Sequence, residues 1–193
     1  MTKRMIVGIT GASGSILGIR MLERLKSFDV ETHLIISAWG ARTLEHETTW
    51  TVEEVRRLAD AVHKPGDLGA TISSGSFRTY GMAIAPCSMK TLAAIAHGYT
   101  EDLIARAADV VLKERRRLVL LARESPLSEI HLENMLRLAR MGVSIVPPVP
   151  AFYNRPKTLD EAVDHIVARA LDQFDLVDDD ARRWDGNVTR QRP

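Results

Sequence analysis

Four short segments carry residue types that hold anions and move protons. Gly11-Ala12-Ser13-Gly14 combines glycine, which lets the backbone approach a ligand closely, with a serine hydroxyl. Residues 86–91 read Pro-Cys-Ser-Met-Lys-Thr and offer hydroxyls, a thiol and a cation. Arg106 and Lys113 are seven residues apart, so on a helix they project from similar faces and can reach one anion. Arg123-Glu124 pairs a bidentate phosphate ligand with a carboxylate that can accept a proton.

Each segment also has a purely structural alternative. The glycine turn is neither a full G-x-G-x-x-G fingerprint nor a P-loop with its lysine, so it can be a plain strand-to-helix turn. Ser88 can simply cap a helix, and Cys87 has no adjacent histidine to activate it. The two cations can lie on a solvated helix face, which is the role we expect for residues 115–117, and the Arg-Glu pair can be an ion pair. Residues 73–76, Ser-Ser-Gly-Ser, form either a surface loop or a ligand loop.

Five apolar runs, each followed by helical spacing, must position these segments. The pattern predicts alternating parallel strands and helices. In such sheets ligands bind beyond the carboxyl ends of the strands, where loops meet helix N-termini. We therefore expect one α/β domain, a Rossmann-like (flavodoxin-like) parallel sheet with helices on both faces. The expected strands cover residues 5–10, 30–37, 82–86, 118–122 and 143–147.

Two helix boundaries have explicit signals. Thr158-Leu159-Asp160-Glu161 is a capping-box sequence, in which the threonine and glutamate oxygens accept hydrogen bonds from free backbone amides. Gly142 is a helix stop after an apolar stretch. We expect a domain over residues 1–177 and a polar tail over residues 178–193, in which Trp184 stands out.

Composition narrows the function classes. The chain has 193 residues, 45% of them hydrophobic, and a net charge of +1, which gives no broad electrostatic footprint for nucleic acid or an anionic membrane. A single cysteine and the lack of a signal-peptide pattern predict a cytoplasmic protein. The six histidines show no metal-ligand spacing, so we expect no metal, and no G-x-S-x-G elbow supports a hydrolase.

Taken together, several separated motifs resemble one family. The sequence is similar, from about residue 5 to residue 169, to the UbiX-type flavin prenyltransferases, and in particular to the branch associated with phenylacrylic and hydroxyarylic acid decarboxylases. The related flavoproteins that decarboxylate peptidyl cysteine have Pro-Ala-Ser-Ala-Asn where this chain has Pro-Cys-Ser-Met-Lys, so they match less well. The motifs that carry the resemblance are Gly11-Ala12-Ser13-Gly14, residues 86–92, residues 106–114, residues 130–135 and Pro150-Ala151-Phe152-Tyr153.

The resemblance implies a reaction, a cofactor and partners. Such enzymes join the dimethylallyl group of dimethylallyl phosphate to reduced FMN, without a metal, and the prenylated FMN serves UbiD-type decarboxylases of aromatic acids. Related proteins are homododecamers with flavin sites at trimer contacts, so we expect an oligomer, here a dodecamer. The alternative is a non-catalytic FMN-binding component of a hydroxyarylic acid decarboxylase complex.

The resemblance also assigns roles to residues. The implied FMN ligands are Gly11, Ala12, Ser13, Ser37, Ser88, Met89, Lys90, Thr91 and Arg123. The implied ligands of the prenyl phosphate are Arg106, Lys113, Tyr153 and Arg169, and the implied catalytic residues are Ser13, Glu47, Lys113 and Glu124. Trp184 is the counterpart of an aromatic residue that closes over the site. We hypothesise that flavin N5 attacks the allyl carbon, that ring closure at C6 follows, and that Glu124 or the departing phosphate takes the ring proton.

Overall fold

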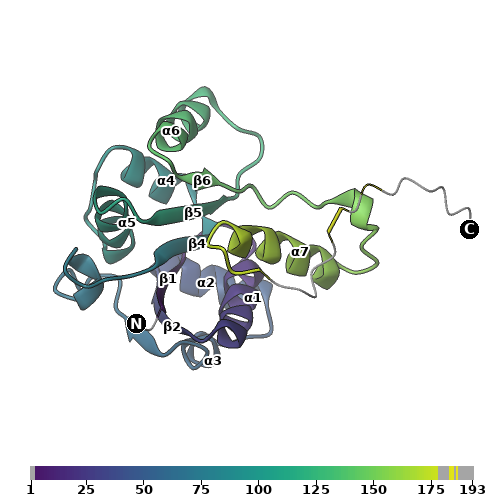
Figure 1. Cartoon of the computed structure of the whole chain (residues 1–193), viewed down its shortest axis with the longest axis horizontal. Coiled ribbons are helices and arrows are strands. Elements are labelled where there is room, and N and C mark those ends of the chain that lie inside the picture. Colours follow the sequence, from purple (N-terminus) through teal and green to yellow (C-terminus); the bar gives the residue numbers. More distant parts are fainter. Residues whose placement is uncertain (1–2, 178–182, 185, 187–193) are drawn as a thin grey trace, which may run out of the picture.

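A computed structural model describes residues 3–177, 183–184 and 186. The described chain forms one six-stranded parallel sheet in the order β3-β2-β1-β4-β5-β6 (Figure 1). The strands are β1 (Lys3–Ile9), β2 (Val30–Ile36), β3 (Ala61–His63), β4 (Gly81–Cys87), β5 (Arg117–Ala122) and β6 (Ser144–Ile145). The helices are α1 (Ile16–Leu25), α2 (Ala38–Glu47), α3 (Val52–Arg56), α4 (Met89–Ala96), α5 (Leu103–Lys113), α6 (Glu129–Arg140) and α7 (Leu159–Asp172), with 3₁₀ turns η1 (Lys26–Phe28), η2 (Thr71–Ser73) and η3 (Phe152–Asn154).

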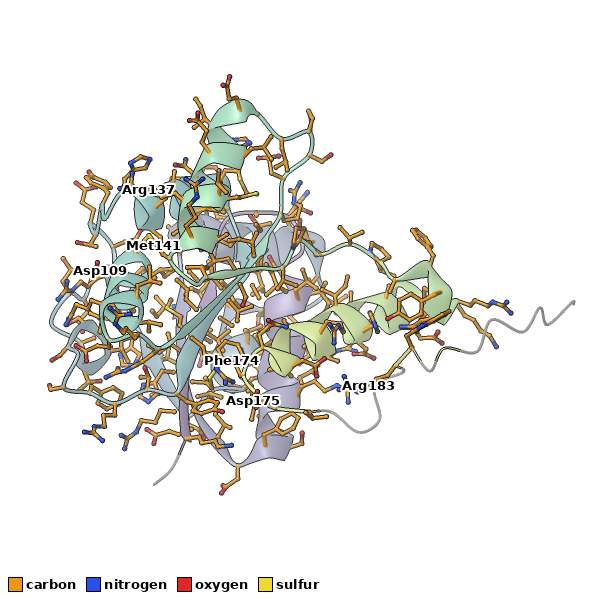
Figure 2. The ribbon with its side chains drawn as sticks, turned by 45° about the horizontal axis from the view of Figure 1, so that its top comes forward. Asp109, Arg137, Met141, Phe174, Asp175 and Arg183 are labelled. Carbon is orange, nitrogen blue, oxygen red and sulfur yellow. The ribbon has the colours of Figure 1, made fainter. Side chains whose placement is uncertain are left out.

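Helices cover both faces of the sheet, as the sequence predicted. One apolar cluster joins α1 and α7 to the sheet and includes the fully buried Phe174, while a second joins α4, α5 and α6 to the other face (Figure 1). The central strand β4 is buried along its whole length, because it lies between these two layers. Arg183, towards the end of the chain, pairs with Asp172 at 2.8 Å, next to α7 (Figure 2).

The five predicted strands are confirmed to within a few residues at their ends. Two short elements, α3 and the edge strand β3, were missed, because three to five residues are too few to show a periodicity. The helix signals hold: Gly142 adopts φ +89° directly after the end of α6, and Thr158 accepts from the amide of Glu161. The Glu161 carboxylate caps the amide of Lys157 rather than that of Thr158, at 2.9 Å.

No helix in the described part of the chain has the length and apolar character that a bilayer span requires.

The contact between α1 and the sheet depends on a missing side chain. A Cβ at Gly18 would overlap the carbonyl oxygen of Ala85 and lie 2.8 Å from Ile9 Cγ1. We expect Gly18→Ala to lower the free energy of unfolding by about 3 kcal/mol, because the helix must move away from the sheet. Gly66→Ala is the matched control, since its Cβ would meet nothing within 4 Å. Equal urea midpoints for the two variants would contradict this packing.

Histidines join the two strands at one edge of the sheet. His33 Nδ1 on β2 lies 2.9 Å from His63 Nε2 on β3, and the rings stack with centroids 5.2 Å apart. His33 Nε2 is 3.0 Å from Glu31 Oε1, and Glu31 also pairs with Arg4 at 2.9 Å. Burial and the charge of His33 lower the pKa of His63, while Asp67 acts weakly in the opposite direction.

This edge makes stability depend on pH. Between the lowered pKa of His63 and its ordinary value of 6.5, the unfolded chain binds more protons than the folded chain. The free energy of unfolding therefore falls as the pH drops through that window. Urea titrations at about pH 7.5 and about pH 5.5 should show a larger loss for the wild type than for His63→Gln, whose side chain does not titrate. An equal loss of unfolding free energy in both proteins would contradict the assignment of this pH dependence to His63.

Candidate functional site

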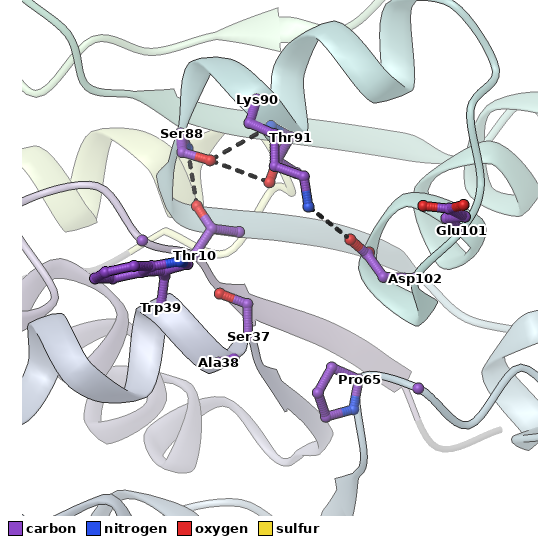
Figure 3. Close-up of a pocket in the computed structure, with 12 residues that line it drawn as sticks. Thr10, Ser37, Ala38, Trp39, Pro65, Ser88, Lys90, Thr91, Glu101 and Asp102 are labelled. Carbon is purple, nitrogen blue, oxygen red and sulfur yellow. Dashed lines mark hydrogen bonds and ion pairs between the residues drawn. The ribbon is translucent and has the colours of Figure 1, made fainter.

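The ends of three neighbouring strands open into one cavity. Thr10 and Gly11 follow β1, Ser37 follows β2 and Ser88 follows β4, and all four line a space of about 410 Å³ (Figure 3). This is the position that the sheet topology predicts for a ligand, and the volume is typical of a small-molecule site. The other lining residues are Ala38, Trp39, Pro65, Gly66, Lys90, Thr91, Glu101 and Asp102.

Three helices begin at this cavity. Ser37 caps α2 by accepting from the amide of Gly40 at 3.0 Å, and Ser88 caps α4 by accepting from the amide of Thr91 at 3.4 Å. Asp102 caps α5 in the same way, at 2.9 Å from the amide of Ala105. Because the N-terminal end of a helix carries a partial positive charge, three such ends favour an anionic group in the cavity.

Gly11 allows the glycine turn to lie against α2. A Cβ at this position would be only 2.5 Å from Trp39 Cβ. Any larger residue would therefore displace either the turn or the first turn of α2. The indole of Trp39 is 67% exposed, and Arg42 lies over its ring, 5.0 Å from the centroid.

Glu47 sits at the other side of the glycine turn. Its Oε2 accepts from the amides of Gly14 and Ser15 at 2.8 and 3.1 Å. Partial desolvation acts to raise the pKa of Glu47, but hydrogen bonds from Ser13 and these two amides, together with the charge of Arg123, outweigh it and lower the pKa. Glu47 is therefore a carboxylate at neutral pH, and it orders the turn that carries Ser13.

Arg123 and Glu124 follow β5, but their hydrogen-bond partners differ. Arg123 Nε donates to the carbonyl of Ser13 at 3.3 Å, and its amide donates to the carbonyl of Cys87 at 3.1 Å. It thus ties the glycine turn to the end of β4. Glu124 is exposed and accepts from the amide of Ser125 at 3.1 Å. It does not form an ion pair with Arg123 among the described contacts, and neither residue lines the cavity.

The two cations of α5 lie outside the cavity. Arg106 pairs with Asp109 at 2.9 Å and donates to the carbonyl of Ser73 at 3.2 Å. Lys113 pairs with Glu114 at 2.8 Å, at the far end of α5, about 15 Å along the helix from the cap that lines the cavity.

Lys113 lines a separate hollow instead. That space of about 360 Å³ lies between α5 and α6, where Asp109 faces Arg137 and Met141 (Figure 2). The two cations lie on one side of α5, as their spacing predicted, because Arg106 donates to the carbonyl of Ser73 and Lys113 Nζ lies beside Gly75. Within one chain the structure does not bring them to the ends of β1, β2 and β4.

Tyr153 lies in η3, before α7 begins, and Arg169 lies in the last turn of α7. The Tyr153 hydroxyl is 3.3 Å from His165 Nε2, and its ring makes an edge contact with Trp184 at 5.5 Å. Arg169 pairs with Asp172 at 2.6 Å, and its charge contributes to lowering the pKa of His165, after burial. Tyr153 and Arg169 thus share His165 as a neighbour, away from the cavity.

The structure places the implied FMN ligands in two groups. Gly11, Ser37, Ser88, Lys90 and Thr91 line the cavity. Ala12, Ser13 and Met89 are close in sequence to these residues, and Arg123 follows β5, but none of the four lines the cavity. The ammonium of Lys90 is 3.6 Å from Asp102 and so links the start of α4 to the start of α5 (Figure 3).

Sequence reasoning missed several lining residues. Thr10 and Trp39 are each within two residues of a predicted strand exit, so the exits themselves were signals for them. Asp102 is a good N-cap type before an apolar helix, a signal that was available. Pro65 and Gly66 follow β3, which is too short to be seen, and no signal pointed to them.

One sequence expectation is wrong. Residues 115–117 are not simply a solvated charge run, because the Arg116 side chain is only 14% exposed and donates to the carbonyls of Gly75 and Phe77 at 2.7 and 2.9 Å. Arg117 pairs with Asp175 at 2.6 Å. Arg116 thus holds residues 75–77 close to the end of α5, so those residues are part of the fold rather than a free loop.

The remaining reactive groups add no further chemistry. Cys87 is fully buried, and burial raises the pKa of its thiol, so it is not poised as a nucleophile. Among the residues that the structure describes, no group of three or more His, Cys, Asp or Glu side chains is arranged to hold a metal ion.

Comparisons with known proteins show which family the chain belongs to. The flavoprotein family model matches residues 1–174. A probable UbiX-like flavin prenyltransferase of Streptomyces sp. (strain D7) is 66% identical over 184 residues, which cover 95% of this chain and 92% of that protein. The flavin prenyltransferase LpdB of Lactiplantibacillus plantarum is 50% identical and covers 96% of this chain and 100% of its own.

A solved structure is also highly similar to this chain in fold and sequence. The crystal structure of AnUbiX (PadA1) in complex with FMN and dimethylallyl pyrophosphate superposes with a TM-score of 0.95 at 54% identity, over 96% of this chain and 99% of the other. The chain belongs to the flavoprotein family and, within it, to the UbiX-like flavin prenyltransferases.

Proposed function

We propose that this chain transfers the dimethylallyl group of dimethylallyl phosphate to reduced FMN. The observation that carries the proposal is the cavity at the strand exits, onto which three helix N-termini open. The solved relative that contains FMN and dimethylallyl pyrophosphate is 54% identical, so the same ligand classes suit this cavity. The alternative, an FMN carrier without activity, has no observation of its own in its favour.

The cavity fits a flavin mononucleotide by its chemistry. Ser37, Ser88 and Thr91 provide hydroxyls beside free helix amides, which suit a phosphate and ribityl oxygens. Because Gly11 has no side chain, the backbone at this wall of the cavity can pack directly against Trp39. When bound, reduced FMN supplies the nucleophilic N5 and C6 positions at which the prenyl group attaches. Ser13 and Arg123 would order the adjoining loops.

The prenyl phosphate needs cations where its C–O bond breaks. The departing phosphate gains negative charge, and fixed cations stabilise it without a metal. Arg106, Lys113, Tyr153 and Arg169 are the groups we assign to it. Because they lie apart from the cavity within one chain, we infer that another copy of the chain completes each site. A dodecameric UbiX-like relative from Escherichia coli O157:H7, 59% identical with a TM-score of 0.92, supports this assembly.

Two carboxylates can handle the proton. Glu47 accepts a hydrogen bond from Ser13, so the Ser13 hydroxyl could pass its proton to this ionised carboxylate while it takes up the proton that the flavin ring loses. Glu124 is exposed at the end of β5 and is free to accept a proton from a group brought close by a neighbouring copy. We assign catalytic roles to Ser13, Glu47, Lys113 and Glu124. We further propose that a UbiD-type decarboxylase receives the product in the cytoplasm.

An anaerobic reaction tests the function. The purified protein is mixed with reduced FMN and dimethylallyl phosphate, and the released flavin is analysed by mass spectrometry. A flavin that is heavier by one isoprenoid unit, formed only when the phosphate ester is present, is the expected result. A flavin mass unchanged from FMN, with FMN bound, would support the carrier instead.

A further inference from the structure

Thr10 is a buried polar residue in the wall of the cavity whose role the reaction does not explain. It directly follows β1, and only 1% of its surface is exposed. Its Oγ1 accepts from the amide of Ser88 at 2.8 Å (Figure 3). The same oxygen donates to the carbonyl of Pro86 at 2.8 Å. Its own amide also donates to the carbonyl of Pro86, at 3.2 Å. Through these hydrogen bonds Thr10 joins the end of β1 to the loop that begins α4.

The Thr10 hydroxyl is not placed to bind a ligand itself. A threonine hydroxyl has a single hydrogen, and here Pro86 accepts it. The amide of Ser88 occupies an acceptor position of the same oxygen. With both partners inside the protein and almost no exposed surface, any effect of Thr10 on a bound molecule must act through Ser88.

The chain of hydrogen bonds continues from Ser88 into the cavity. Ser88 Oγ accepts from the amide of Thr91 at 3.4 Å and donates to Thr91 Oγ1 at 3.1 Å. The Thr91 hydroxyl is therefore an acceptor in this pair, and its own hydrogen meets no protein acceptor among the hydrogen bonds of the described residues. That hydrogen remains available to an oxygen of a bound ligand.

We infer that Thr10 is a positioning residue of the flavin site, which fixes the amide of Ser88 and thereby the direction in which the Ser88 and Thr91 hydroxyls meet the flavin. This inference rests on the proposed function, because it takes FMN as the occupant of the cavity. It predicts that the Thr10 hydroxyl, not its bulk, matters for flavin affinity.

Three variants separate positioning from stability. Thr10→Val keeps the shape but removes the hydroxyl, Thr10→Ser retains the hydroxyl, and Thr32→Val is the control. Thr32 lies on β2, outside the cavity, and is 2% exposed. Its Oγ1 donates to the Asp60 carboxylate at 2.9 Å and accepts from the amide of Asp60 at 3.1 Å. Thr32→Val therefore removes a matched buried hydroxyl at a remote position.

We expect FMN titrations to give a Kd about ten-fold higher for Thr10→Val, which corresponds to the loss of one buried hydrogen bond. Thr10→Ser should stay within about two-fold of the wild type, and Thr32→Val should lower the unfolding midpoint without weakening FMN binding. In steady state, Thr10→Val should raise the KM for reduced FMN and leave the KM for dimethylallyl phosphate unchanged. Wild-type affinity in Thr10→Val, or equal weakening in Thr32→Val, would overturn the inference.

A double-mutant cycle tests the route through Ser88. If Thr10 acts by orienting Ser88, adding Thr10→Val to Ser88→Ala should change the Kd by less than about two-fold, because the oriented hydroxyl is already absent. If the double variant instead raised the Kd by the product of the two single-variant factors, the route through Ser88 would be refuted. Wild-type protein that fails to bind FMN at all would instead refute the proposed function.

Discussion

Replacing Lys113 with methionine is expected to slow prenyl transfer by about two to three orders of magnitude, the usual loss when one group that stabilises developing negative charge is removed. The Lys113 side chain is 48% exposed and pairs only with the neighbouring Glu114 among the described residues, so its removal leaves the core unchanged. FMN affinity should stay close to that of the wild type, because Lys113 does not line the cavity. The measurement is the anaerobic rate of product formation, with FMN binding determined in parallel.

Lys26→Met is the matched control for this experiment. Lys26 is an exposed lysine in η1, on the opposite face of the sheet from α5. This variant should retain the wild-type rate. A Lys113→Met protein with a normal rate, or one whose rate falls only because FMN no longer binds, would exclude Lys113 from the phosphate site.

The second large effect is expected at Glu47. Glu47→Gln keeps an oxygen that can accept from the amides of Gly14 and Ser15 but loses the negative charge. We expect the rate to fall about 100-fold, because the group that takes the proton from Ser13 is no longer a base. The urea midpoint should change little, since the turn retains an acceptor.

The pH profile adds a second readout at Glu47. Its pKa is lowered, so the carboxylate stays ionised as the pH falls to about 5, and this residue should not cause a loss of wild-type rate there. Glu45→Gln is the control on the same helix; Glu45 accepts only a long bond from the amide of Val52, at 3.4 Å, among the described contacts. If both variants react at the wild-type rate, Glu47 has only a structural role.

The exits of β1, β2, β4 and β5 were predictable because these strands are long and apolar and each exit carries a polar residue or glycine. Ser37 and Ser88 are good examples, since an N-cap type directly after an apolar run indicates where the helix begins. The sheet rule then places both at the same edge. Gly11, Ser37 and Ser88 could therefore be placed at one edge of the sheet from the sequence, and all three line the cavity.

The features that the sequence did not predict depend on tertiary contacts, which leave no local pattern in the sequence. Arg116 reads as part of a solvated charge run, yet it is held by carbonyls about 40 residues earlier in the chain. The pairing of His33 with His63 likewise requires β3, which is only three residues long. The roles of Lys113 and Tyr153 came from the family resemblance, because spacing cannot show which copy of a chain a side chain serves.

Mixed assemblies of two inactive variants give the most direct test of a site shared between copies. Gly11→Ala displaces the wall of the flavin cavity, since its Cβ would collide with Trp39, but leaves Lys113 intact, whereas Lys113→Met does the reverse. Co-assembled at random in equal amounts, they should recover about a quarter of the wild-type rate, because half of the cavities are intact and half of those receive a lysine from a neighbour. A mixture no more active than its two components would place the whole reaction within one chain and contradict the account.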